Sequence, residues 1–313
     1  MSQNRMITFP TDRHGLVHRE IALAAGFTDD EIRRELRDGR LSRVHRGVYV
    51  APALRSPEAV HRLAAVASAE ISGDRSVLSH QSAATVHGLS LLRPDLQRIH
   101  TTNGRLTGGW RTSIRQDHVG SLADGEVTAI DGVRVTSLER TAVDVARTAR
   151  GGFAAALSVF DSALRLGADR EPMADGLAAT RRGVGPARRA FSLADCKAEN
   201  PGESWSRAVM IESGLPTPRL QHEFRDADGN VIARTDFDWS GRLVGEFDGD
   251  VKYQKYLRPG ETPFDAMKRE KLREDALRRL GIMVIRWTWS DLVSGRLLPM
   301  IREWLVRLDL MAA

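Results

Sequence analysis

The chain has 313 residues, a formal net charge of +5 and 42% hydrophobic residues, which is typical of a folded protein with two or more domains. No stretch of about 18 consecutive apolar residues is present, so we expect no transmembrane helix and no membrane partner. The opening sequence MSQNRMITFP lacks the pattern of a secretory signal peptide. The one cysteine, Cys196, excludes internal disulfides and a cysteine-rich zinc site, so we expect a reducing, cytoplasmic location.

Two short helices and a basic hairpin are predicted near the N-terminus. Residues 17–25 favour a helix, and Thr28 and Glu31 have the spacing of a capping box that starts a second helix, which ends near Gly39. The sequence that follows, RLSRVHRGVYVAP, has spaced apolar residues around a glycine, which is typical of a short hairpin. Helix, turn, helix and hairpin is the layout of a winged helix-turn-helix.

The second predicted helix and the hairpin are rich in arginine. Guanidinium groups bind phosphates and guanine edges well, so this pattern indicates DNA binding. By helical spacing, Arg33, Arg37 and Arg40 are expected to share one face, while Arg43 and Arg46 fall on the wing. The alternative is a solvated helix face with ion pairs between neighbouring turns. The candidate DNA-binding residues are Arg33, Arg34, Arg37, Arg40, Arg43 and Arg46.

The segment GLVHREIALAAGFTDDEIRRELRDGRLSRVHRGVYV resembles the N-terminal winged-helix domain of AbiEi-type antitoxins of type IV toxin–antitoxin systems. Three later blocks look like the second domain of that family: SHQSAATVHGL from Ser79, IHTT from Ile99 and VTSLERTAVD from Val135. The resemblance covers roughly residues 10–165. It implies a transcriptional autoregulator that binds DNA repeats and counters a nucleotidyltransferase-like toxin, so DNA and a cognate toxin are the expected partners.

Four histidines lie within these blocks or close to them: His80, His87, His100 and His118. Their sequence neighbours are Ser, Gln and Thr, and no Asp, Glu or Cys completes a zinc ligand set at the usual spacing. We therefore expect capped or hydrogen-bonded structural histidines here and no metal site.

The last third of the chain predicts a helix, three strands, a long charged helix, one more strand and a closing helix. Asn200 and Pro201 are suited to the cap and the first position of the first helix. A three-residue loop at 240–242 would place Asp236 directly opposite Glu246, about 5 Å away, whereas a two-residue loop would break this pairing. Asp238 and Asp248 share that face by the two-residue alternation of strands, so the face is strongly acidic. Such paired carboxylates favour Mg²⁺ or Mn²⁺ binding over a merely solvated acidic face.

Roughly residues 198–295 resemble the very-short-patch-repair-like branch of the PD-(D/E)xK endonucleases. The resemblance rests on Glu203, the RTD sequence ending at Asp236, the EFDG sequence beginning at Glu246, and the downstream sequences EKLREDAL and LGIMVIR. It implies a metal-dependent DNA phosphodiesterase in which Asp236 and Glu246 ligate the metal and Glu203 assists. The metal would activate water and stabilise the charge that develops on the phosphate.

The sequence departs from this family at one position, because the pattern requires lysine where this chain has Asp248. Lys252, just beyond the strand, and Lys268 and Lys271, on the next helix, are candidates for the missing positive charge. Glu203 has a competing role as a helix cap. The candidate catalytic residues are Glu203, Asp236, Glu246, Asp248, Lys252 and Lys271, of which Glu203, Asp236 and Glu246 are the candidate metal ligands.

The sequence predicts a multidomain α+β or α/β protein. Its expected parts are a winged helix-turn-helix over 1–56, an AbiEi-antitoxin-like middle domain of mixed α/β structure over 57–195, and a restriction-endonuclease-like αβββαβ domain over 196–313. We expect a DNA-binding protein that hydrolyses DNA with Mg²⁺ or Mn²⁺, related to toxin–antitoxin or defence systems. The alternative is a non-enzymatic AbiEi-like antitoxin and autoregulator with a degenerate nuclease fold. A dimer is compatible with either hypothesis.

Overall fold

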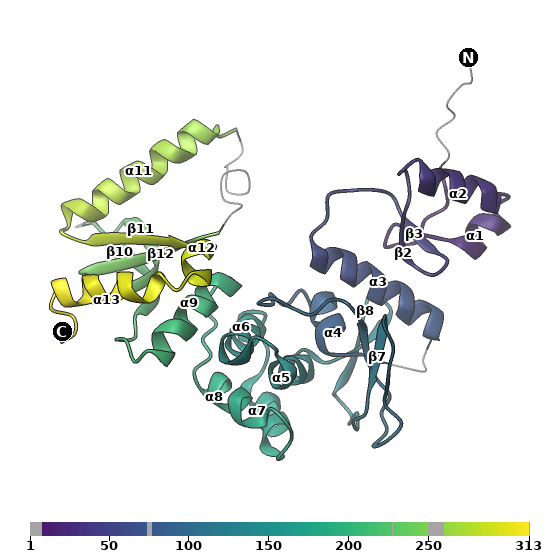
Figure 1. Ribbon diagram of the computed structural model, residues 1–313. Coiled ribbons are helices and arrows are strands. Elements are labelled where there is room, and N and C mark those ends of the chain that lie inside the picture. Colours follow the sequence, from purple (N-terminus) through teal and green to yellow (C-terminus); the bar gives the residue numbers. More distant parts are fainter. Residues whose placement is uncertain (1–7, 74–76, 227, 250–259, 313) are drawn as a thin grey trace. The chain divides into compact units, whose positions relative to one another are not determined.

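The computed structural model describes residues 8–73, 77–226, 228–249 and 260–312 (Figure 1). It is a mixed α/β structure with three sheets. The chain divides into two compact units, the first comprising 1–89 and 94–145 and the second 90–93 and 146–313. The domain boundary expected at residue 195 lies inside the second unit. None of the helices in the described residues is long and apolar enough to span a membrane.

The first unit begins with the predicted order of helix, helix and hairpin. The capping box is present, since the Glu31 N–H donates to the Thr28 hydroxyl and the Thr28 N–H donates to the Glu31 carboxylate. The first helix is shorter than expected, because residues 16–18 form a strand that pairs with the hairpin and buries Leu16 and Val17. The elements are β1 (Leu16–His18), α1 (Arg19–Ala24), α2 (Asp29–Arg37), β2 (Ser42–His45) and β3 (Val48–Val50).

A long helix, α3 (Pro57–Ser72), lies against this small sheet and a six-stranded sheet. Its small residues, such as Ala65, pack with Leu16 and Val48 from the first sheet and with Leu78 and Val135 from the second. The second sheet has the order β6-β7-β5-β4-β9-β8. The remaining elements are β4 (Val77–Leu78), α4 (His80–His87), β5 (Ile99–Thr102), β6 (Trp110–Arg111), β7 (Arg115–His118), β8 (Val127–Ile130), β9 (Val133–Thr136) and α5 (Leu138–Thr148), which continues into the second unit.

The second unit contains a helical part and a four-stranded sheet. The predicted order of helix, three strands, helix, strand and helix is confirmed, with one additional short helix after the last strand. The sheet order is β10-β11-β12-β13, with only the last pair parallel. The elements are α6 (Gly152–Arg165), α7 (Arg170–Ala178), α8 (Val184–Ser192), α9 (Pro201–Glu212), β10 (Arg219–Arg225), β11 (Val231–Trp239), β12 (Leu243–Asp248), α11 (Pro263–Arg279), β13 (Met283–Thr288), α12 (Trp289–Val293) and α13 (Leu297–Arg307).

Helices cover both faces of this sheet, α9 and α13 on one side and α11 on the other (Figure 1). On the first face, Phe237 and Trp287 pack in a core with Ile301 and Leu305 of α13. The contact with α9 is so close that a Cβ at Gly202 would lie 2.0 Å from the Phe247 ring. Because α11 lies over the face on which the acidic residues were predicted, that face is only partly open to solvent.

A buried ion pair joins the helical part to α9. Arg207 donates to Asp161 of α6 at 2.8 Å, and the Ser204 hydroxyl donates to the same carboxylate oxygen at 2.8 Å. The other Asp161 oxygen accepts the backbone N–H of Asp195. These three bonds cross the region in which the sequence predicted a domain boundary.

Candidate functional site

The hairpin has the register that a three-residue loop predicts. Phe237 pairs with Gly245 and Trp239 with Leu243, which confirms the three-residue loop at 240–242. The Phe247 N–H donates to Asp236 Oδ2 at 2.9 Å, so the Asp236 carboxylate is held against the neighbouring strand β12.

Glu203 and Asp236 come together around one amide. Gln221 of β10 donates its side-chain N–H₂ to Glu203 Oε2 at 3.3 Å and to Asp236 Oδ1 at 3.2 Å. The strand β10 is irregular at this residue, because Gln221 has a left-handed backbone with φ of 50°. Two carboxylates from a helix and a strand therefore share a single donor.

Glu203 is 4% exposed and lies in the first turn of α9, whose Asn200 cap is formed as predicted. Its carboxylate accepts the Glu199 N–H at 2.7 Å and the Asn200 side-chain amide. Burial, and next the negative charge of Asp236, raises the pKa of Glu203 to about 8. Glu203 therefore binds backbone at the start of α9 and lies near Asp236, and the negative charge of Asp236 adds to the effect of burial on its pKa.

Glu246 is also buried, but it is bound by arginines. Arg273 of α11 contacts it at 2.6 Å, and Arg286 of β13, directly paired with Glu246 in the sheet, lies at 3.2 Å. Glu270 binds both arginines, so the charges form one network. Among the described residues, the oxygens of Glu203, Asp236 and Glu246 do not form a group within 4.8 Å of one another.

The other predicted residues of this site differ in burial and in their ion-pair partners. Asp248 is half-buried at the end of β12 and is electrostatically linked to Arg286. Asp238 is 1% exposed and bound by Arg219, a pairing that the sequence reasoning did not consider. Lys268 and Lys271 are exposed on α11, whereas Arg273 points to Glu246. Lys252 lies outside the described residues.

The carboxylate donors suit a hard divalent ion. Glu203 is buried and Asp236 half-buried, and their carboxylates offer the oxygen ligands that Mg²⁺ and Mn²⁺ prefer. Glu246 could join them only if its carboxylate turned away from Arg273. Two of the three predicted ligands therefore lie together, and the third is bound by arginines.

The predicted arginines of the first unit fall into two groups. Arg33 pairs with Asp30 on α2, and Arg40 binds Glu35 through two N–H groups, at 2.6 and 2.8 Å. Arg40 lies beyond the end of α2, so it is not on the helical face predicted for it. The other four arginines are exposed, and none of them has an ion pair within the residues that the structure describes; we call them the four exposed arginines: Arg34, Arg37, Arg43 and Arg46.

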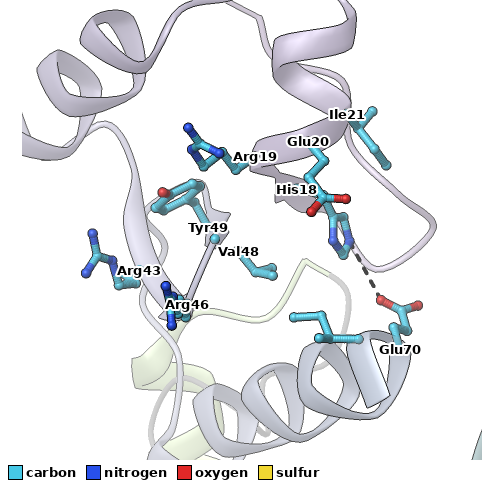
Figure 2. Close-up of a pocket in the computed structure, with 11 residues that line it drawn as sticks. His18, Arg19, Glu20, Ile21, Arg43, Arg46, Val48, Tyr49 and Glu70 are labelled. Carbon is cyan, nitrogen blue, oxygen red and sulfur yellow. Dashed lines mark ion pairs between the residues drawn. The ribbon is translucent and has the colours of Figure 1, made fainter. Parts of the chain in front are cut away.

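A hollow of about 850 Å³ lies beside the hairpin (Figure 2). Arg19, Arg43 and Arg46 line it together with Tyr49. The Arg19 guanidinium is bound by Asp29, which leaves the hairpin arginines as its available positive charges. Glu20 and Glu70 also line the hollow, so its charge is mixed, with the hairpin arginines on one side as candidates for an anionic ligand.

Three of the four histidines form a cluster that the sequence reasoning missed. One ring nitrogen from each of His80, His100 and His118 lies within 4.8 Å of the other two. They come from α4, β5 and β7, so no spacing along the chain could reveal the group. His87 is different, since it bonds the Thr136 carbonyl at 2.7 Å, as expected of a structural histidine.

No protein-family model matches the chain. It is a multidomain α/β protein, and over 294 residues it is 30% identical to each of two relatives. These are the uncharacterized protein MT2308 of Mycobacterium tuberculosis strain CDC 1551 / Oshkosh and the uncharacterized protein Rv2248 of M. tuberculosis strain ATCC 25618 / H37Rv. The alignments cover 90% of this chain and 98% of each relative, so the chain belongs to the family of these mycobacterial proteins.

Proposed function

We propose that this protein binds DNA through the four exposed arginines and hydrolyses DNA at the carboxylates of its C-terminal sheet with Mg²⁺ or Mn²⁺, as part of a toxin–antitoxin or defence system. The observation that carries the nuclease proposal is the pairing of Glu203 and Asp236 around one amide donor. A buried carboxylate beside a half-buried one is costly unless a proton or a cation compensates their charge. An oxygen-ligated divalent ion is the compensation that also supports phosphodiester chemistry.

Each residue of the site has a distinct role in this proposal. Asp236 and Glu203 would hold the metal, with Asp236 fixed by the Phe247 N–H and Glu203 by the Glu199 N–H. When bound, the metal would supply an activated water and stabilise negative charge on the phosphate. Arg273 would provide the positive charge that the related endonucleases obtain from the lysine replaced here by Asp248.

A cleavage assay tests the nuclease proposal. Supercoiled plasmid is incubated with the full chain and Mg²⁺ or Mn²⁺, beside Asp236→Asn, Glu203→Gln and the control Glu212→Gln, which alters an exposed carboxylate at the end of α9. We expect cleavage by the parent and by the control, and loss of at least about 100-fold in both site variants, which corresponds to about 3 kcal/mol of transition-state stabilisation. The proposal is contradicted if the parent cleaves the plasmid with neither Mg²⁺ nor Mn²⁺.

One observation favours a second candidate function, a non-enzymatic AbiEi-like antitoxin and transcriptional autoregulator. Glu246 is engaged by Arg273 and Arg286, so the predicted third ligand is held in an ion-pair network. A nuclease fold that had lost its catalytic activity could keep such a network because it stabilises the fold. This candidate predicts DNA binding and binding of a cognate toxin, with no cleavage under any metal.

DNA binding is common to both candidates and is tested separately. Each phosphate contact that is lost should reduce the slope of log affinity against log salt concentration by about 0.9. We therefore expect the double variant Arg43→Ala and Arg46→Ala to bind DNA more weakly and with a shallower salt dependence. The control Arg302→Ala removes an exposed arginine from α13 in the second unit. Equal effects of the two changes would contradict an N-terminal DNA-binding surface.

A further inference from the structure

A buried histidine cluster in the first unit has the composition of a metal centre. We propose that His80, His100 and His118 bind a divalent transition-metal ion of the zinc class. Their three candidate ligand nitrogens lie within 4.8 Å of one another. His100 Nδ1 and His118 Nε2 share a hydrogen bond of 2.8 Å, whose proton a bound ion would displace. This site is separate from the carboxylates of the second unit and does not depend on the nuclease proposal.

The fold brings the three rings together from distant parts of the sequence. In the parallel pair β5–β7, Thr102 is the partner of His118, and His100 lies two residues earlier on the same face of the sheet. His80 is the first residue of α4 and has a left-handed backbone, with φ of 48°. That conformation is uncommon for a residue with a side chain and is held here only by its surroundings.

Burial favours ligation over solvation. His80 is 6% exposed and His100 is 9% exposed, so water has little access to their rings. The Ser79 hydroxyl lies 3.0 Å from His80 Nδ1. Imidazole nitrogens select zinc, copper or nickel over magnesium. Three of them with one open position make a ligand set found in zinc sites.

Two carboxylates surround the cluster at a greater distance. The Thr101 hydroxyl donates to Asp117 at 2.7 Å, and Arg140 donates to Asp144 at 2.7 Å. Both acids act electrostatically on His118. The negative charge of these two acids would offset part of the charge of a bound ion.

The alternative role of these rings is structural. His80 and His118 stack with ring centroids 3.7 Å apart and planes 14° apart. A metal ion lies in the plane of each ring that binds it, so binding requires one of these rings to turn about its side-chain bonds. A cluster that serves only for packing would not make this change when the metal is added.

Zinc titration of the metal-stripped full chain, without an affinity tag, distinguishes these roles. Calorimetry and thermal melts are recorded with Zn²⁺, beside His100→Gln, His118→Gln and two controls. His87→Gln alters a half-buried histidine of the same unit outside the cluster. His18→Gln removes one ligand from the other group in this unit that could hold an ion, which consists of Asp12, His18 and Glu70. Asp236→Asn tests whether zinc binds at the carboxylates of the second unit.

We expect one zinc ion per chain, a raised melting temperature, and Co²⁺ absorption bands typical of tetrahedral nitrogen ligation. Each cluster variant should weaken zinc binding by at least about 10-fold, while the two control histidine variants and Asp236→Asn keep it. If a cluster variant unfolds, the Co²⁺ spectra of the folded parent and of His18→Gln decide: intense tetrahedral bands present in both support the cluster, and their loss in His18→Gln contradicts it. Zinc affinity that is unchanged in His100→Gln, or lost in His18→Gln, would overturn the proposal.

Discussion

Arg273 of α11 binds Glu246 of β12 through both guanidinium nitrogens, with Nη1 2.6 Å from one carboxylate oxygen and Nη2 2.7 Å from the other. The Arg273 guanidinium is therefore bound to the carboxylate that the sequence predicted as a metal ligand. The helix that covers the acidic face therefore also determines whether Glu246 can take part in metal binding.

Removing this arginine should expose the competition between the ion pair and the metal. Arg273→Ala leaves Glu246 buried with Arg286 as its remaining ion-pair partner, so we expect a loss of about 1–3 kcal/mol in the free energy of unfolding. Mg²⁺ or Mn²⁺ should recover part of that loss. Urea unfolding with and without metal measures both effects, and Arg278→Ala, which breaks an exposed pair with Glu274 on the same helix, is the control. Equal stability of the two variants would show that the buried pair contributes nothing.

Glu203 should make the protein less stable as pH rises. Its pKa is about 8 in the folded chain against an ordinary value of 4.5, so the folded state retains a proton that the unfolded state releases. Stability should be unaffected below pH 4.5, fall between about 4.5 and 8, and level off above 8. Glu203→Gln should flatten this fall, by up to about 1.4 kcal/mol per pH unit. Urea midpoints from pH 5 to 9 test this, and parallel curves for parent and variant would contradict it.

His61 should make the protein more stable as pH rises, which is opposite to the effect of Glu203. Burial lowers its pKa below the ordinary value of 6.5, and its ring bonds the Leu96 carbonyl and the Ser82 hydroxyl. The unfolded chain takes up the proton first, so its contribution to stability is present above pH 6.5 and is lost as pH falls below that value. His87, also lowered by burial, adds to the same trend. The expected result for His61→Gln is a lower stability at pH 7.5 and a shallower loss toward pH 5.

Arg40 and Arg37 should separate folding from DNA binding. Arg40→Ala leaves the buried Glu35 without its bidentate partner, so we expect it to lower the melting temperature of the first unit. Arg37→Ala removes an exposed charge from α2 and should weaken DNA binding with little change in melting temperature. Thermal melts and fluorescence anisotropy with DNA, on both variants, make the comparison. A large melting-temperature change for Arg37→Ala would place that residue in the fold instead.

The sequence predicted the features that depend on local spacing. The capping box of Thr28 and Glu31 and the loop at 240–242 both follow from residues a few positions apart. The arginine network could not be predicted in this way, because Arg273 and Glu246 meet only when α11 lies on the sheet. Gln221 was missed because its strand distorts locally to deliver the amide.

The histidine cluster also could not be predicted from the spacing of residues along the chain. His100 and His118 are adjacent only because β5 and β7 pair in parallel, an arrangement set by the whole sheet. A search for ligands at fixed spacing therefore excluded a group that the fold assembles from three elements.

The ion pair between Asp161 and Arg207 also determines which fragment can be produced alone. A recombinant fragment starting at residue 196 would retain Arg207 in α9 but lose its counter-charge, together with the helices that keep water away from it. The shortest C-terminal fragment that preserves this pair begins before α6, near residue 146. The helical part and the acidic sheet are thus expected to be inherited, expressed and exchanged between proteins as one piece.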